Sequence, residues 1–77
     1  MKAVVLEIVG EQRMHCEGCQ ERVEDMLREM PGVRKVRAEA RKQRVEVLFD
    51  STQVRITSIA DRLREAGYQT KGATESP

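Results

Sequence analysis

The chain is poor in several kinds of residue, and each shortage argues against a class of function. Its 77 residues include only two cysteines and one histidine. A closed structural zinc site needs four protein ligands, so this set is too small to build one. Phe49 and Tyr68 are the only aromatic residues, whereas recognition of single-stranded nucleic acid on a sheet relies on stacked aromatic rings. The composition therefore argues against a zinc-stabilised module and against a nucleic-acid-binding sheet.

Long apolar runs are lacking as well. No stretch approaches the roughly 20 apolar residues of a membrane span, and no secretory apolar segment follows Lys2. The formal net charge of +1 gives no overall attraction to nucleic acid or to a membrane surface. We therefore expect a cytoplasmic protein with neither membrane insertion nor a nucleic-acid partner. In that compartment, paired cysteines bind metal or carry out redox chemistry more often than they form a structural disulfide.

The apolar pattern of the first two thirds of the chain predicts four elements. Residues 3–9 are mostly apolar and β-branched and end at a glycine, which indicates a strand buried on much of both faces. From about residue 19 the apolar residues recur at helical spacing, until a Pro-Gly pair at residues 31–32 stops the helix. Residues 33–40 and 45–49 alternate between apolar and polar, which predicts an antiparallel hairpin.

A second helix and a last strand complete the pattern. Apolar residues at helical spacing predict a helix that ends at Gly67, and it begins either with a cap at Thr57 or Ser58 or nearer Thr52. A short strand is expected to follow at residues 68–71. The order β-α-β-β-α-β predicts an α+β, ferredoxin-like fold with two helices on a four-stranded antiparallel sheet.

One domain is expected to span residues 1–72. The last residues, 73–77, are small or polar, so we expect them to form a disordered tail.

Charge is distributed unevenly within the domain. Residues 17–30 hold five acidic and two basic residues, whereas residues 33–44 hold six basic residues and one acidic residue. Such charged segments are typical of solvated faces. The acidic segment, residues 17–30, also predicts that a partner protein docks through a surface with basic residues.

The two cysteines, Cys16 and Cys19, stand two residues apart where the first strand gives way to the first helix. A turn of this kind points both sulfurs outward, and the N–H groups at the start of the helix favour the thiolate form. His15 is the only histidine, so it and the two cysteines supply at most three of the four ligands of a closed metal site. The site is therefore expected to keep an open coordination position. An open pair of thiolates suits a transferable soft ion, above all Cu(I), with Zn(II) or another soft metal ion as the alternative.

Three short stretches carry a family resemblance. Met14, Cys16 and Cys19 form a Met-x-Cys-x-x-Cys motif, a Pro-Gly-Val turn occupies residues 31–33, and a Gly-Tyr pair occupies residues 67–68. Through them the chain resembles, from residue 3 to residue 71, the heavy-metal-associated domain. That family includes free copper chaperones and the N-terminal metal-binding domains of copper-transporting P-type ATPases. The combination of motif and element order is far more specific than a lone Cys-x-x-Cys.

The resemblance implies a role for each residue of the motif. Cys16 and Cys19 would bind the metal, Met14 would pack beneath the loop, and Tyr68 would lie near the site. The tyrosine at position 68 makes the chain similar to bacterial members of the family. We expect His15 to point to solvent, and the alternative is a third ligand, since imidazole suits copper and zinc. Met14 and Tyr68 are further candidates for a third ligand or for a residue that surrounds the ligands.

The resemblance also implies a partner. A P-type ATPase that transports metal, or another protein with a Cys-x-x-Cys site, would receive the ion. The protein would be a monomer without metal, and a metal-bridged dimer is the alternative assembly when the ion is bound.

The sequence departs from the family pattern in the loop before the motif. Residues 11–13 make this loop about three residues longer on its N-terminal side, which bears on metal affinity and on the choice of partner. His15 occupies the position where many zinc and cadmium members carry an acidic residue. The absence of that acidic residue favours copper.

Two other functions remain as alternatives. Within the metal-binding class, the chain would be a Zn(II), Cd(II) or Hg(II) binder in detoxification or sensing. From the enzyme class, it would be a small dithiol oxidoreductase, but the chain is short for such a domain and lacks an aromatic residue and a proline around its cysteines. We therefore expect a metal carrier and not an enzyme.

Overall fold

A computed structural model of the protein describes residues 1–15 and 17–76, with the backbone alone for residue 17 and residues 72–76. Six elements follow one another along these residues. They are β1 (Lys2–Val9), α1 (Glu17–Arg28), β2 (Val33–Glu39), β3 (Arg44–Phe49), α2 (Ile56–Glu65) and β4 (Gln69–Ser76). This order confirms the predicted β-α-β-β-α-β arrangement.

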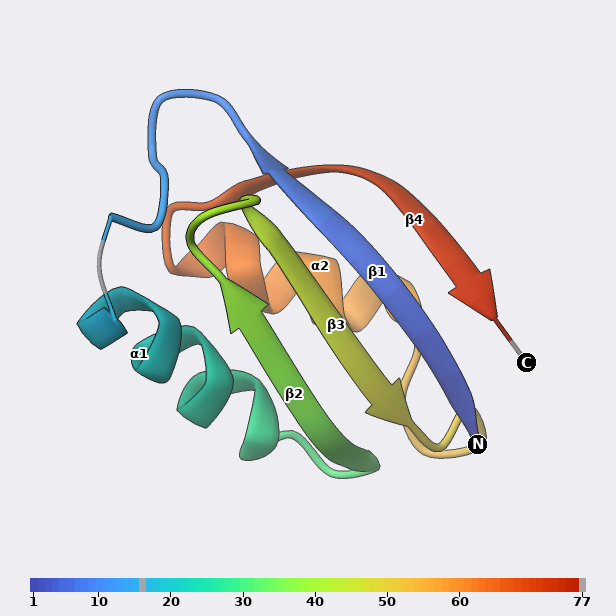
Figure 1. Ribbon diagram of the computed structural model, residues 1–77. Coiled ribbons are helices and arrows are strands. Elements are labelled where there is room, and N and C mark those ends of the chain that lie inside the picture. The colour runs from blue at the N-terminus through green and yellow to red at the C-terminus, as the bar shows by residue number, and fades with distance from the viewer. Residues whose placement is uncertain (16, 77) are drawn as a thin grey trace.

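The four strands form one antiparallel sheet in the order β2-β3-β1-β4. Both helices lie on the same face of the sheet, and the loop from β1 to α1 lies at one end of it (Figure 1). The predicted ferredoxin-like fold is therefore confirmed.

The core lies between the helices and the sheet. Alternate strand residues and one face of each helix supply it, as period-two strands and amphipathic helices dictate. Ten side chains are almost fully enclosed: Val4, Leu6, Met14, Val23, Leu27, Val45, Val47, Phe49, Ile59 and Leu63. Burial of each aliphatic side chain of this kind stabilises the fold by roughly 1.5–3 kcal/mol.

Strand β1 is less buried than its sequence predicts. Its even-numbered apolar residues from Val4 to Ile8 are buried, but Ala3, Val5 and Val9 are only half-buried. The reason is that the helices cover only one face of the sheet and leave the other open. The expectation of burial on both faces was therefore wrong, although the strand itself lies where it was predicted.

The ends of the helices differ from the predicted positions by a few residues. Helix α1 begins at residue 17 and ends at Arg28, but its apolar stripe continues to Met30, which packs against the core. Helix α2 begins at Ile56 after Arg55, whose side chain makes no capping hydrogen bond. The prediction of a cap at Thr57 or Ser58 was therefore wrong.

Helix α2 ends as predicted, at a glycine. Gly67 has a φ of 97°, a left-handed conformation that favours glycine. The N–H of Gly67 donates to the carbonyl of Arg64 (2.9 Å), and the N–H of Tyr68 donates to the carbonyl of Leu63 (3.0 Å). This Schellman-type ending reverses the chain and directs Tyr68 toward the core.

The last strand is longer than predicted. Strand β4 runs to Ser76, and its backbone pairs with β1 as far as Ala3. No side-chain pattern predicts this pairing, because residues 73–76 are small or polar and pairing along a neighbouring strand depends on backbone groups. Residues 73–76 therefore belong to the sheet and not to a disordered tail, and residue 77 lies outside the described residues.

Neither helix among the described residues has the length and apolar character that crossing a membrane requires.

Candidate metal centre

Cys19 lies in the first turn of α1, as its third residue. The side chain is half-buried and packs against the edge of the core. Unpaired backbone N–H groups and the positive end of the helix dipole favour a negative charge at this position. Cys19 is therefore placed where a thiolate is stabilised, as the motif predicts. Cys16 lies outside the described residues.

Met14 anchors the loop that enters the motif. Its side chain is only 2% exposed and forms part of the core. Its backbone is also held, because its N–H donates to Oε1 of Gln43 (3.0 Å) and its carbonyl accepts from Nε2 of the same side chain (2.7 Å). The structure places Met14 beneath the loop as a packing residue.

His15 is exposed to solvent, in keeping with the expectation for this side chain. Among residues 1–15 and 17–76, no three His, Cys, Asp or Glu side chains come close enough together to hold a metal ion. Coordination by His15 stays a prediction.

Tyr68 lies next to Cys19, although 49 positions separate them in the sequence. The ring is 8% exposed. Burial raises the pKa of the phenol above its ordinary value, and the neighbouring Cys19 raises this pKa further, whereas a hydrogen bond from Gln12 lowers it. Tyr68 is therefore held in its neutral form beside Cys19.

The lengthened loop before the motif packs against the start of β4. Gln12 hydrogen-bonds Tyr68 and lies against Gly67. Gly10 has a φ of 86°, and a Cβ on it would lie only 2.7 Å from Oε1 of Gln69. The flexible end of Gln69 could move away from such a Cβ, so it is the left-handed backbone conformation that favours glycine at residue 10. Through Gln12, the loop of residues 11–13 contacts the junction between α2 and β4.

Two glutamines that the sequence did not single out join the motif to the turn between β2 and β3. Besides the bonds from Gln43 to Met14, Oε1 of Gln20 accepts from the N–H of Ala40 at 2.5 Å. Nothing in the local sequence points to these contacts, because they join residues 20 and 29 positions apart. Only the packing of the hairpin against the loop brings them together.

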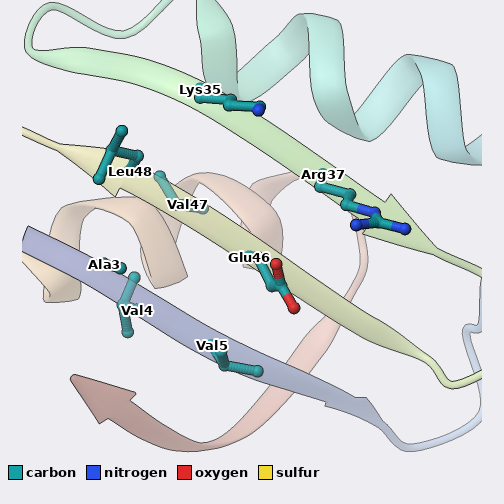
Figure 2. Close-up of a pocket in the computed structure, with 8 residues that line it drawn as sticks. All are labelled: Ala3, Val4, Val5, Lys35, Arg37, Glu46, Val47 and Leu48. Carbon is teal, nitrogen blue, oxygen red and sulfur yellow. The ribbon is translucent and has the colours of Figure 1, made fainter. Parts of the chain in front are cut away.

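A shallow pocket occurs elsewhere, on the open face of the sheet. Residues of β1, β2 and β3 line it, with α2 behind the sheet in the view of Figure 2. Its lining includes Val5, Leu48, Lys35, Arg37 and Glu46. Neither the loop nor Cys19 contributes to it, so the pocket is separate from the motif.

The chain is similar to known proteins over most of its length. Residues 12–69 match the model of the heavy-metal-associated domain. The copper chaperone CopZ of Enterococcus hirae is 36% identical over 56 residues, which cover 73% of this chain and 81% of that protein. The copper chaperone CopZ of Bacillus subtilis is 32% identical over 68 residues, which cover 88% of this chain and 94% of that protein.

Solved structures show the same likeness. A copper-binding domain from HMA7, a P-type ATPase, superposes with a TM-score of 0.88 at 26% identity and covers 100% of both chains. A CopZ metallochaperone superposes with a TM-score of 0.81 at 25% identity and covers 90% of this chain and 98% of that one. The two relatives found by sequence are copper chaperones rather than enzymes, which agrees with the expectation of a carrier.

Proposed function

The chain belongs to the heavy-metal-associated domain family, and from this premise we propose that it is a copper chaperone. It binds one Cu(I) ion between the thiolates of Cys16 and Cys19 and passes the ion to a partner protein. The observation that carries the proposal is the similarity to two copper chaperones over 73% and 88% of the chain.

The surroundings of Cys19 support Cu(I) as the cargo. Thiolates are soft ligands that select Cu(I) or Zn(II) over hard cations. Among the described residues, which leave out Cys16, no three His, Cys, Asp or Glu side chains form a group that could hold a metal ion. Zn(II) in a structural site takes four ligands, whereas Cu(I) accepts the low coordination that two thiolates provide. The neutral phenol of Tyr68 adds no charge beside Cys19.

Transfer proceeds by exchange of thiolate ligands. A cysteine thiolate of the partner bonds to the under-coordinated ion, one of the two cysteines of the chaperone then leaves, and a second exchange completes the transfer. Every step replaces one sulfur–metal bond by another, so the oxidation state of the metal does not change. An open site near the surface, which the start of α1 offers, is what this exchange requires.

The partner is a copper-transporting P-type ATPase. The TM-score of 0.88 with a domain of such an ATPase supports a partner of the same shape. Glu21, Asp25 and Glu29 are exposed on and just after α1, so the docking surface of the partner is basic. Arg28 pairs with Asp25 at 3.4 Å and offsets part of this charge.

The protein works in the cytoplasm, where thiols stay reduced, and it is a monomer without metal.

Transfer is tested by mixing the protein, loaded with one Cu(I) ion, with the metal-free two-cysteine domain of a copper ATPase under anaerobic conditions. The two proteins are separated by ion exchange and their copper content is measured. We expect copper to redistribute faster than it leaves the protein for a small chelator, because the shared intermediate avoids free metal. Copper that stays on the chain, or moves only at the rate of spontaneous release, would contradict the proposal.

A further inference from the structure

The turn between β2 and β3, residues 40–43, contacts both flanks of the metal-binding motif. On the entry side, the side-chain amide of Gln43 bonds the N–H and the carbonyl of Met14, at 3.0 and 2.7 Å. On the exit side, the N–H of Ala40 donates to Oε1 of Gln20, which directly follows Cys19 in α1. One short turn therefore holds the residues on either side of the two cysteines.

The turn is itself held in place. Nε2 of Gln43 also donates to the carbonyl of Ala40 (2.5 Å), and the carbonyl of Gln43 accepts from the N–H of Ile8 (2.8 Å) at the end of β1. The amide of Gln43 thus uses both of its N–H groups and its oxygen. A glutamine bonded in this way has one orientation, and it imposes that orientation on Met14.

The backbone conformation of Gln43 gives a second indication. Its φ is 52°, and it is the only residue other than glycine with a positive φ in the part of the chain that the structure describes. Glycine or asparagine is the ordinary choice for such a turn. Glycine would suit the hairpin better but would lack the amide that reaches Met14. The side chain at this position therefore holds the loop as well as the turn.

We propose that Gln43 is a positioning residue for metal binding, which preorganises the Cys-x-x-Cys loop by fixing the backbone of Met14. The inference rests on the proposed function of metal carriage and adds a residue far from the motif in sequence. Its physical basis is that a loop already held in its binding conformation loses less conformational entropy when the ion binds. The loop is lengthened by residues 11–13, so this restraint matters here.

Gln43→Gly separates positioning from stability. The substitution removes the amide but keeps, and even favours, the left-handed turn, so we expect the hairpin to form and the melting temperature to stay close to that of the unsubstituted protein. Exchange of the Met14 amide hydrogen in the metal-free protein should accelerate by about tenfold or more, since its partner is lost. The affinity for Cu(I), measured against a chelator, should fall by about tenfold.

Two further variants complete the test. Gln43→Glu keeps the acceptor for the N–H of Met14 but places a carboxylate oxygen against the carbonyls of Met14 and Ala40, which repel it, so its Cu(I) affinity should fall at least as far as that of Gln43→Gly. Gln53→Gly is the matched control, because Gln53 is exposed in the turn between β3 and α2. That turn lies at the opposite end of the sheet from the loop between β1 and α1 (Figure 1). Gln53→Gly should leave Cu(I) affinity unchanged.

The outcomes separate the two proposals. Unchanged Cu(I) affinity in Gln43→Gly, with or without faster exchange of the Met14 amide, would overturn the positioning role. A loss of affinity that Gln53→Gly shares would overturn it as well. Failure of the unsubstituted protein to bind Cu(I) would instead contradict the proposed function, and amide exchange in the metal-free protein would still report whether Gln43 holds the loop.

Discussion

Replacement of both cysteines, Cys16→Ser and Cys19→Ser together, should abolish one-to-one binding of Cu(I). These are the only two thiols in the chain, and a serine hydroxyl is a hard, protonated donor that binds soft ions poorly. The described residues around Cys19 offer no other cluster of metal-binding side chains. The measurement is an anaerobic titration of each protein with Cu(I) against a chelator of known affinity.

Two controls make the result specific. The melting temperature of the metal-free double variant should change little, because Cys19 is only half-buried at the edge of the core. His15→Ala should retain tight binding, since His15 is exposed. Stoichiometric Cu(I) binding by the double serine variant would show that the ligands lie elsewhere. A loss of affinity in His15→Ala as large as in a single serine variant would make His15 a ligand.

Met14→Ala should destabilise the metal-free protein more than any other substitution in the loop. The Met14 side chain is 2% exposed and belongs to the core, so its truncation leaves a cavity beneath the loop. The free energy of unfolding should fall by about 2–5 kcal/mol, as for other large-to-small core substitutions. Urea denaturation measures the change, with Met30→Ala as the control because Met30 is only half-buried. Equal effects of the two substitutions would contradict the anchoring role of Met14.

Met14→Leu distinguishes packing from coordination. Leucine has a similar volume and no sulfur, so the cost in stability should stay below about 1.5 kcal/mol. If Met14 only packs, Cu(I) affinity should match that of the unsubstituted protein. A large loss of Cu(I) affinity at nearly unchanged stability would instead assign the thioether to the metal.

The fold was predictable because the residues that end its helices are evident in the sequence. The Pro-Gly pair at residues 31–32 separates α1 from β2, and Gly67 ends α2. Between these points the apolar residues follow the period of a helix or of a strand, which sets the element order. The same pattern could not locate the start of α2, because Arg55 precedes the helix without a capping side chain.

Features that depend on tertiary contact were not predictable. The pairing of residues 73–76 with β1 uses backbone groups, and these leave no mark on side-chain composition. The bonds from Gln43 to Met14 span 29 positions. A glutamine in a polar turn looks like any solvated residue until the hairpin is packed against the loop.

The candidate site was predicted unevenly. The cysteine motif was evident from spacing and family resemblance, and Cys19 lies at the start of a helix as expected. The nearness of Tyr68 to the motif was implied by the resemblance alone, because no local pattern joins residues 49 positions apart. The contact between Gln12 and Tyr68 was not foreseen, since it depends on how the lengthened loop folds back.

The central claim is that this chain is a Cu(I) carrier. Its most direct test is an anaerobic titration of the reduced protein with Cu(I) and, separately, with Zn(II), each against a competing chelator of known affinity. A tight one-to-one complex with Cu(I), together with weak binding of Zn(II), is the predicted result, because two soft thiolates suit Cu(I) better than Zn(II), which takes four ligands in structural sites. Preference for Zn(II), or weak binding of both ions, would contradict the copper-chaperone account.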